Sequence, residues 1–255
     1  MLLTEMTWPE FGARTQHGCA IIPIGAVEPH GPHLPLGADT MISDYFARRL
    51  AADIDAWITP TIGYGVATPP QRLGGTFPGA IAISGSTFIH LVTDILTSLA
   101  EHGARQQIII NSAIDNISFL CEAARIVTAM IPDTRVMIVN WWDVVGETFR
   151  NTLARETGVA RSDDHHAGMV ESSLVMHIAP GTTHPDLANT DPIGLGPRRF
   201  SYHLFPLPDD AATPSGIVYT ARKASADIGG RVADQVAQEM ASAVRRELAI
   251  DSGRA

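Results

Sequence analysis

Short, continuous apolar runs that alternate with helix-length amphipathic segments constrain this chain most strongly. The runs cover residues 20–24, 57–62, 108–110 and 136–139, and helical periodicity covers 40–52, 86–102, 117–130 and 227–248. Apolar runs of this length are typical of strands that are buried on both faces, and their alternation with helices predicts parallel βαβ units with right-handed crossovers. We therefore expect an α/β fold with a mainly parallel sheet. In the segment 86–102, Ser86 is predicted to cap the helix and Gly103 to end it.

Polar or aromatic clusters follow three of the four predicted strands. They are Glu28 with His30, then Asn111 with Asp115 and Asn116, and finally Trp141 with Trp142 and Asp143. In open α/β sheets, ligands bind outside the carboxyl ends of the strands. The three clusters should therefore meet at one rim of the sheet.

The loop after the first strand, residues 25–39, carries ligand types that suit a divalent metal. Glu28, His30, His33 and Asp39 stand among several prolines and glycines. Carboxylates and imidazoles suit zinc or manganese, and the side chains of Glu28 and His30 point the same way if this segment is extended. The alternative is a rigid surface loop in which Asp39 is only the N-cap of the helix beginning near Thr40.

A second acidic candidate is Glu171. A helix starting near Ala167 would place Glu171 on one face with Leu174, Val175 and Ile178. A carboxylate on an apolar face needs a metal, a cation or a hydrogen-bond donor. Both a metal-shell role and a structural hydrogen bond to the next element are compatible with this position.

Two stretches rich in proline and glycine interrupt the pattern. Residues 63–79 form a long loop that we expect near the site, because long loops in compact domains are often functional. Residues 180–216 show little periodicity, and they are expected either to cover the site or to pack against another subunit.

Composition excludes several classes of protein. The net charge is −9 and no basic run occurs, which argues against nucleic acid and acidic membranes as partners. No apolar stretch reaches the roughly 20 residues of a membrane helix, and the N-terminus does not resemble a signal peptide. Two cysteines fit a reducing compartment, so a cytoplasmic protein is expected.

Motifs along nearly the whole chain resemble the creatininase (creatinine amidohydrolase) family. They include GAVEPHGPHLPLGAD at 25–39, WWD at 141–143 and HAGMVESSL at 166–174. The resemblance implies one three-layer α/β/α domain over residues 1–255, commonly assembled as a homohexamer. It also implies a metal centre, often binuclear, that hydrolyses cyclic amides or other C–N bonds.

The resemblance also assigns roles to single residues. Glu28, His30 and Asp39 look like metal ligands, His166 like the catalytic histidine, and Trp142, next to Trp141, like the aromatic residue that covers the substrate. Asp115 stands where creatininase has a glutamate ligand, and Ile114 and Ser162 stand at a tyrosine and a second tryptophan of its substrate pocket.

One ligand of the family is missing, because its second-motif histidine is replaced by Ala113. His30, Asp39 and Asp115 would still make a three-ligand site with room for water. Whether a second ion binds weakly, or whether His33, His165 or Glu171 compensates, stays open.

These residues imply a metal-dependent amidohydrolase that uses zinc, manganese or iron, with one or two ions. Metal-activated water would attack the carbonyl of a small cyclic amide, an imide or a related C–N bond, and His166 would protonate the leaving nitrogen. One alternative is the same site acting on a formamide, a lactone or a keto-cyclitol. Another is a non-catalytic oligomeric family member with a decayed site.

Overall fold

A parallel four-stranded sheet forms the middle layer of the molecule, with strand order β2-β1-β3-β4. The computed structural model describes residues 1–15, 18–67, 77–188, 215–218 and 220–249. The strands are β1 (Cys19–Ile24), β2 (Ala56–Ile58), β3 (Gln106–Asn111) and β4 (Arg135–Asn140). Ile22 pairs with Ile109 and Asn111 with Asn140, so β1, β3 and β4 end at the same rim.

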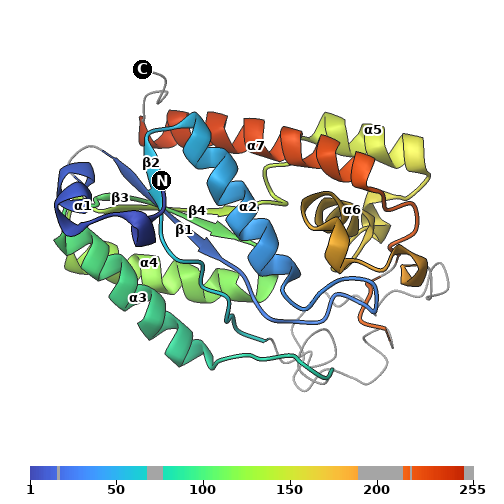
Figure 1. Ribbon diagram of the computed structural model, residues 1–255, viewed down its shortest axis with the longest axis horizontal. Coiled ribbons are helices and arrows are strands. Elements are labelled where there is room, and N and C mark those ends of the chain that lie inside the picture. Colours follow the sequence, from blue (N-terminus) through green and yellow to red (C-terminus); the bar gives the residue numbers. More distant parts are fainter. Residues whose placement is uncertain (16–17, 68–76, 189–214, 219, 250–255) are drawn as a thin grey trace.

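Helices cover both faces of this sheet, which confirms the predicted three-layer α/β/α arrangement (Figure 1). The helices α2 (Ala38–Asp53) and α7 (Ala226–Leu248) lie on one face, and α3 (Gly85–Glu101) and α4 (Ile117–Met130) lie on the other. Two further helices, α5 (Glu147–Thr157) and α6 (Met169–Ile178), lie beyond the carboxyl end of the sheet (Figure 1). A short helix, α1 (Trp8–Arg14), lies near its amino end.

The strands divide their side chains between two cores because neighbouring residues of a strand point to opposite faces. Ile21 and Ile108 pack with Phe46 of α2 and Val236 of α7. Their neighbours in the strands, such as Ile22 and Ile109, pack instead with residues of α3 and α4. Each helix buries one apolar face on the sheet, and the predicted inward residues of α7, from Ile228 to Met240, are buried.

Most predicted elements are present, but one local prediction is wrong. The cap of α3 is Ser84 rather than Ser86, because the Ser84 hydroxyl accepts the N–H of Thr87 at 3.2 Å. The alternative interpretation of Asp39 as an N-cap does not hold, since α2 begins at Ala38 and Asp39 lies inside its first turn. Much of 180–216 and part of 63–79 lie outside the described residues, so their predicted roles stay predictions.

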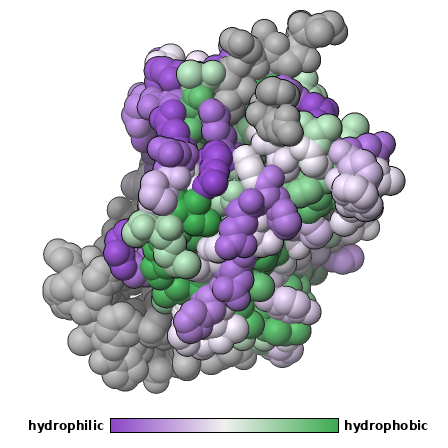
Figure 2. Space-filling model, turned by 90° about the vertical axis from the view of Figure 1, so that its left-hand side faces the viewer, coloured by the Kyte–Doolittle hydropathy of each residue, from purple (hydrophilic) through white to green (hydrophobic). Residues whose placement is uncertain are grey.

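The end of the molecule away from the carboxyl rim has a mixed surface. Figure 2 views that end and shows hydrophobic patches set among hydrophilic residues. Among the described residues, none of the helices is long and apolar enough to span a membrane.

Amides join the loops at the carboxyl rim. Asn111 Nδ2 donates to Asn140 Oδ1 at 2.8 Å, which ties the ends of β3 and β4 together. Asn116 Nδ2 donates to the carbonyl of Gly25 at 3.1 Å, and its Oδ1 accepts the N–H of Val66 at 2.9 Å. The predicted meeting of the clusters at one rim is confirmed, and it positions the candidate site.

Candidate metal centre

The loop after β1 reaches the start of α2 because a glycine permits close contact. A Cβ at Gly25 would lie 2.5 Å from the Thr40 nitrogen and 2.7 Å from the Asp39 carbonyl carbon. A side chain there would push the two backbones apart. Gly25 therefore brings Asp39 next to the segment that carries Glu28 and His30.

Three carboxylates surround the imidazole of His30. Its Nε2 lies 3.3 Å from Asp39 Oδ1, 3.7 Å from Glu171 Oε1 and 4.0 Å from Glu28 Oε1. His30 is fully buried, and Asp39 is 1% exposed. The site thus concentrates negative charge in a place from which water is largely excluded.

Hydrogen bonds to carbonyls assign the protons on two imidazoles. His30 Nδ1 lies 3.2 Å from the carbonyl of Glu28, and His166 Nε2 lies 2.9 Å from the carbonyl of Pro29. A carbonyl can only accept, so these nitrogens carry the protons. The lone pairs are then on His30 Nε2, which faces the carboxylates, and on His166 Nδ1, which lies 3.7 Å from Glu28 Oε1.

The residues present fit a divalent cation. His30 Nε2 and both carboxylate oxygens of Asp39 are buried without a hydrogen-bond partner among the described residues. Unpaired buried polar atoms are costly unless something else satisfies them. Ligand atoms within 4.8 Å of one another form two groups: Glu28, His30 and His166, and His30, Asp39 and Glu171. Both groups use His30.

Electrostatics at the site also reflect uncompensated negative charge. Burial, reinforced by Asp39, raises the pKa of Glu28 well above its ordinary value. Burial opposes a charge on His30, but Asp39 and Glu171 outweigh it and hold the pKa of His30 well above its ordinary value. Burial and the neighbouring His30 lower the pKa of His166.

Glu171 stands at the start of α6 and uses its two oxygens differently. Oε2 accepts the N–H of Ala167 at 2.6 Å, whereas Oε1 faces His30. Burial works against its ionisation, yet His30, helped by His166 and the Ala167 N–H, lowers the pKa of Glu171 to about 2. The geometry therefore combines the two roles considered for Glu171, a structural hydrogen bond and a place beside the ligand set.

Two histidines considered as replacement ligands are near the site but outside the ligand groups. His33 is buried, and its Nε2 lies 2.7 Å from the hydroxyl of Ser172, which donates to the Ala167 carbonyl. Burial lowers the pKa of His33 to about 4. His165 is exposed at the rim. Within the described residues, neither histidine belongs to a ligand group.

The second motif contributes less than its position predicted. Ala113 is buried, and Asp115 follows it in a short 3-10 helix, Ile114–Asn116. The charge of Asp115 helps to raise the pKa of Glu28, so Asp115 is near the site. Of the residues described, however, the groups of converging ligand atoms contain Glu171 and not Asp115. The expected set of His30, Asp39 and Asp115 is not one of these groups and stays a prediction.

A large cavity of about 560 Å³ opens beside the ligands. Three of the predicted substrate contacts, Trp141, Trp142 and Ile114, line it, together with Glu28, His166 and Glu171. The fourth, Ser162, is not among its lining residues and instead donates to Asp163 at 2.9 Å. Its neighbours Arg161 and Asp164 line the cavity.

Sequence reasoning missed one wall of this cavity. Leu153 and Ala154 of α5, followed by Val159, face it. Only Leu153 of α5 is buried, so the helix has no apolar stripe to reveal it. The cavity is also lined by Asp164, and burial raises the pKa of this carboxyl group to about 6.

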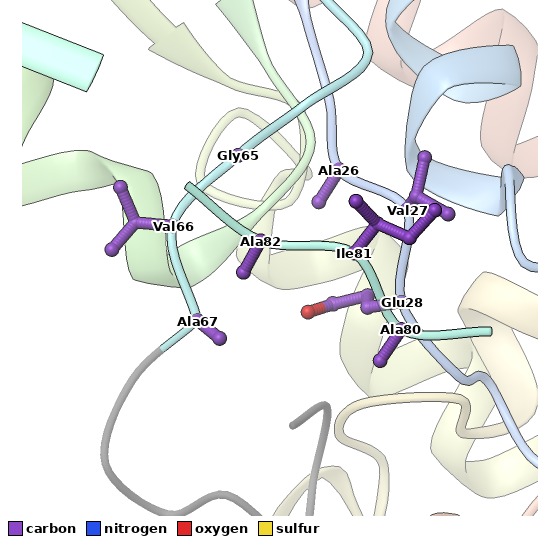
Figure 3. A pocket seen from close by; sticks show the side chains of 9 residues that line it. All are labelled: Ala26, Val27, Glu28, Gly65, Val66, Ala67, Ala80, Ile81 and Ala82. Atoms are coloured by element: carbon purple, nitrogen blue, oxygen red, sulfur yellow. The ribbon is translucent and has the colours of Figure 1, made fainter. Parts of the chain in front are cut away.

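A small cavity of about 110 Å³ lies on another side of Glu28. Figure 3 shows the Glu28 side chain reaching into it among small residues. These are mainly Ala26, Gly65, Ala67, Ala80 and Ala82. Glu28 thus contributes to the walls of both cavities.

Comparisons with known proteins agree with this geometry. Residues 4–244 match the sequence profile described as Creatininase: Creatinine amidohydrolase. The chain is 31% identical to creatinine amidohydrolase of Pseudomonas putida over 95% of each chain. It is 28% identical to 3-dehydro-scyllo-inosose hydrolase of Thermotoga maritima, over 70% of this chain and 56% of that relative. A solved structure titled "Creatininase Mn" superimposes with a TM-score of 0.88 and 28% identity, over 96% of this chain and 98% of that one.

Proposed function

The chain belongs to the creatininase family, and from this premise we propose that it is a metal-dependent hydrolase that cleaves an amide or a related non-peptide C–N bond of a small molecule. Two of the relatives, a creatinine amidohydrolase and a 3-dehydro-scyllo-inosose hydrolase, support hydrolysis as the type of reaction. The bond, the metal and the substrate are the parts that we add.

One observation carries the proposal. Within the described part of the chain, His30 Nε2 and both oxygens of Asp39 are buried without hydrogen-bond partners, and Nδ1 of His166 lies nearby. In a protein that did not bind a cation here, only a proton on His30 would offset the buried carboxylates, at a cost in stability.

The residues that would hold the ion are His30 and Asp39, with Glu171 or Glu28 completing the set. One nitrogen and two or three carboxylate oxygens suit zinc and manganese. Both ligand groups use the same His30 nitrogen, which binds one ion at a time. We therefore propose one tightly held ion. A divalent ion here supplies Lewis acidity, which polarises a carbonyl and lowers the pKa of water.

His166 is the proposed acid and base. Its lowered pKa keeps the imidazole neutral near pH 7, so Nδ1 can accept a proton from the attacking water. Glu28 lies 3.7 Å from this nitrogen, and the Pro29 carbonyl holds the ring in place through Nε2. The proton on Nδ1 then passes to the leaving nitrogen. Trp142 and Ile114 of the large cavity contact the substrate.

The alternatives of a keto-cyclitol substrate and of a non-catalytic protein can each be distinguished from this proposal. A keto-cyclitol would need many hydrogen bonds, whereas the large cavity is lined mainly by apolar side chains, so an amide fits better. A decayed, non-catalytic site would leave the protein without metal and without turnover. Assembly as a homohexamer and a cytoplasmic location stay predictions.

Metal analysis combined with amide hydrolysis tests the function. The purified protein should contain zinc or manganese, lose activity on chelation and regain it when either ion is restored. Asp39→Asn should lose the metal and the activity together. His166→Asn should keep the metal and lose activity on the order of 100- to 10,000-fold. Glu101→Gln, an exposed change at the end of α3, is the matched control. A protein free of metal whose activity survives chelation would contradict the proposal.

A further inference from the structure

The wall of the large cavity indicates which substrates the site takes. We propose that the enzyme selects amides that carry one bulky, uncharged apolar group, such as an aromatic ring or a branched or cyclic alkyl group. This inference rests on the proposed function and adds the substrate class to it. The apolar group of the substrate binds in the large cavity.

Size is the first argument. The large cavity holds about 560 Å³, which is in the range of sites for drug-sized ligands. A small amide or a five-membered ring would leave most of it filled with water. A substrate with an apolar group gains affinity by displacing that water.

The chemistry of the wall is the second argument. Trp142 and Val145 come from the segment after β4, Leu153 and Val159 from α5 and its end, and Met169 and Val170 from α6. Together they surround the cavity with aromatic, branched and thioether side chains. No hydroxyl or amide side chain besides Ser112 is among the described lining residues.

Both arginines of the wall already have partners, which is the third argument. The guanidinium of Arg150 donates to the carbonyls of Trp142 and Val145. Arg161 pairs with Glu147 through both terminal nitrogens. A charged substituent would have to displace these contacts in order to be satisfied.

Asp164 completes this picture on the acidic side. Its Oδ1 accepts the N–H of Val170 at 3.1 Å, in the first turn of α6. The carboxylate of Asp164 thus stabilises the cavity wall and is not a binding group for a cationic substrate. A neutral apolar group can therefore be buried in this cavity without the free-energy cost of burying an unpaired polar or charged group.

The catalytic end of the cavity fixes where the amide lies. Glu28, His166 and Glu171 belong to the same wall, so the scissile bond lies at these residues and the apolar group extends toward α5. The small cavity on the other side of Glu28, lined by alanines and a glycine, has room only for a small substituent. We therefore expect amides with one bulky and one small side.

A size series of N-methyl amides tests the inference. The probes are N-methylacetamide, N-methylbutanamide, N-methylcyclohexanecarboxamide and N-methyl-3-phenylpropanamide, titrated calorimetrically into the zinc-loaded enzyme and also assayed for turnover. We expect affinity and kcat/KM to rise along the series, on the order of fourfold per buried methylene. An amide of equal length with a terminal carboxylate should bind at least tenfold more weakly than its uncharged counterpart.

Two substitutions to tryptophan on α5 locate the effect. Ala154→Trp fills the cavity and should abolish the gain along the series, whereas Arg155→Trp, one position along the same helix and exposed, should leave it intact. Circular dichroism checks that both variants fold. Ala154→Leu, a milder filling, should lower the affinity for the two largest probes if the tryptophan variant does not fold.

Each outcome separates the two proposals. If affinity rises with probe size but none of the probes is hydrolysed, the preference for apolar groups is supported and the proposed amidase function is contradicted. Hydrolysis with affinity that is flat along the series, or unchanged by filling at Ala154, overturns the apolar class. Tighter binding of the carboxylate probe also overturns it, and points to Arg161 as an anion receptor instead.

Discussion

Individual side chains at the carboxyl rim carry charge that the protein alone does not balance. Asp39, Glu171 and Glu28 surround one imidazole nitrogen, and the oxygens of Asp39 have no hydrogen-bond donor among the described residues. A proton on His30 is the simplest counter-charge when no ion is present. A cation and that proton therefore compete for the same place.

This competition makes metal affinity depend on pH. The pKa values of Glu28 and His30 are both raised, so protons occupy these groups to a higher pH than usual and must leave when an ion binds. Affinity for zinc should therefore rise as the pH increases from about 5.5 to 8, with proton release on binding. Calorimetry in buffers of different ionisation enthalpy measures that release. An affinity that is constant across this range would show that these groups are not ligands.

The two cysteines should differ sharply in reactivity. Cys19 is buried in β1, and burial raises the pKa of its thiol to about 12, whereas Cys121 is exposed on α4. Only the thiolate reacts with a disulfide reagent. One thiol per chain should react in the native protein and both should react in denaturant, with Cys121→Ser as the control. Two rapidly reacting native thiols would contradict the burial of β1.

Helix packing holds these side chains in place, and the contact between α6 and α7 is the clearest case. Ser225 caps α7 by accepting the N–H of Ile228, and its own N–H donates to the hydroxyl of Ser173 on α6 at 3.0 Å. One turn into α7, a Cβ at Gly229 would lie 1.9 Å from the Ser173 carbonyl oxygen. Glycine therefore permits α7 to touch the helix that carries Glu171.

Neighbouring glycines on α7 give a matched test. Gly229→Ala should destabilise the protein by about 2 kcal/mol or more, because the clash is with backbone and α6 must move. At Gly230, a Cβ would meet only the side chain of His177 at 3.3 Å, so Gly230→Ala should be close to neutral or gain up to about 1 kcal/mol from helix propensity. Denaturant unfolding measures both. Equal stabilities would mean that the helices do not pack this closely.

Hydrophobic periodicity predicted the helices that bury a continuous row of apolar residues and missed the helices that do not. The helices α3, α4 and α7 were predicted because each presents a row of buried apolar residues. In contrast, α1 buries none of its residues and α5 buries only Leu153, so neither presents a row of buried apolar residues. At the start of α3, several hydroxyl residues compete as caps, and only the backbone geometry selects Ser84.

The site was predictable to the extent that its residues are close in sequence. Glu28, His30 and Asp39 share one loop and one helix start, and both carboxylates lie within 4.0 Å of His30 Nε2. The choice between Asp115 and Glu171 as their partner depends on how α6 lies against the rim, which no local pattern reveals. The resemblance pointed to His166, and the structure adds that its Nδ1 is the free nitrogen.

The helices on both faces pack on one four-stranded sheet. We propose that the chain is a single domain. The core on one face includes residues of α2, β1, β3 and α7, elements that are distant in sequence. A cation at the rim would connect the loop after β1 to the start of α6. Binding at this point should therefore stabilise the entire fold and not one loop.

Thermal unfolding with and without metal tests this expectation. An ion at 100 times its dissociation constant adds about 2.7 kcal/mol of stability, which corresponds to a rise in Tm of about 5–10 °C for a chain of this size. The transition should stay single with zinc and without it. Asp39→Asn should show no rise, while the exposed Glu101→Gln should behave like the native sequence. A rise in Tm retained by Asp39→Asn would place the ion elsewhere.

The amide contacts among the rim loops matter to anyone who wishes to re-engineer this protein. Asn116 holds Gly25 and Val66 together, and Asn111 holds Asn140, so three loops are fastened as one piece. Grafting a foreign loop at 111–116 alone would break buried amide pairs and shift the acid-bearing loop beside it. Chimaeras with other specificities should therefore transplant these loops as a set, or leave the asparagines untouched and vary only the cavity wall on α5.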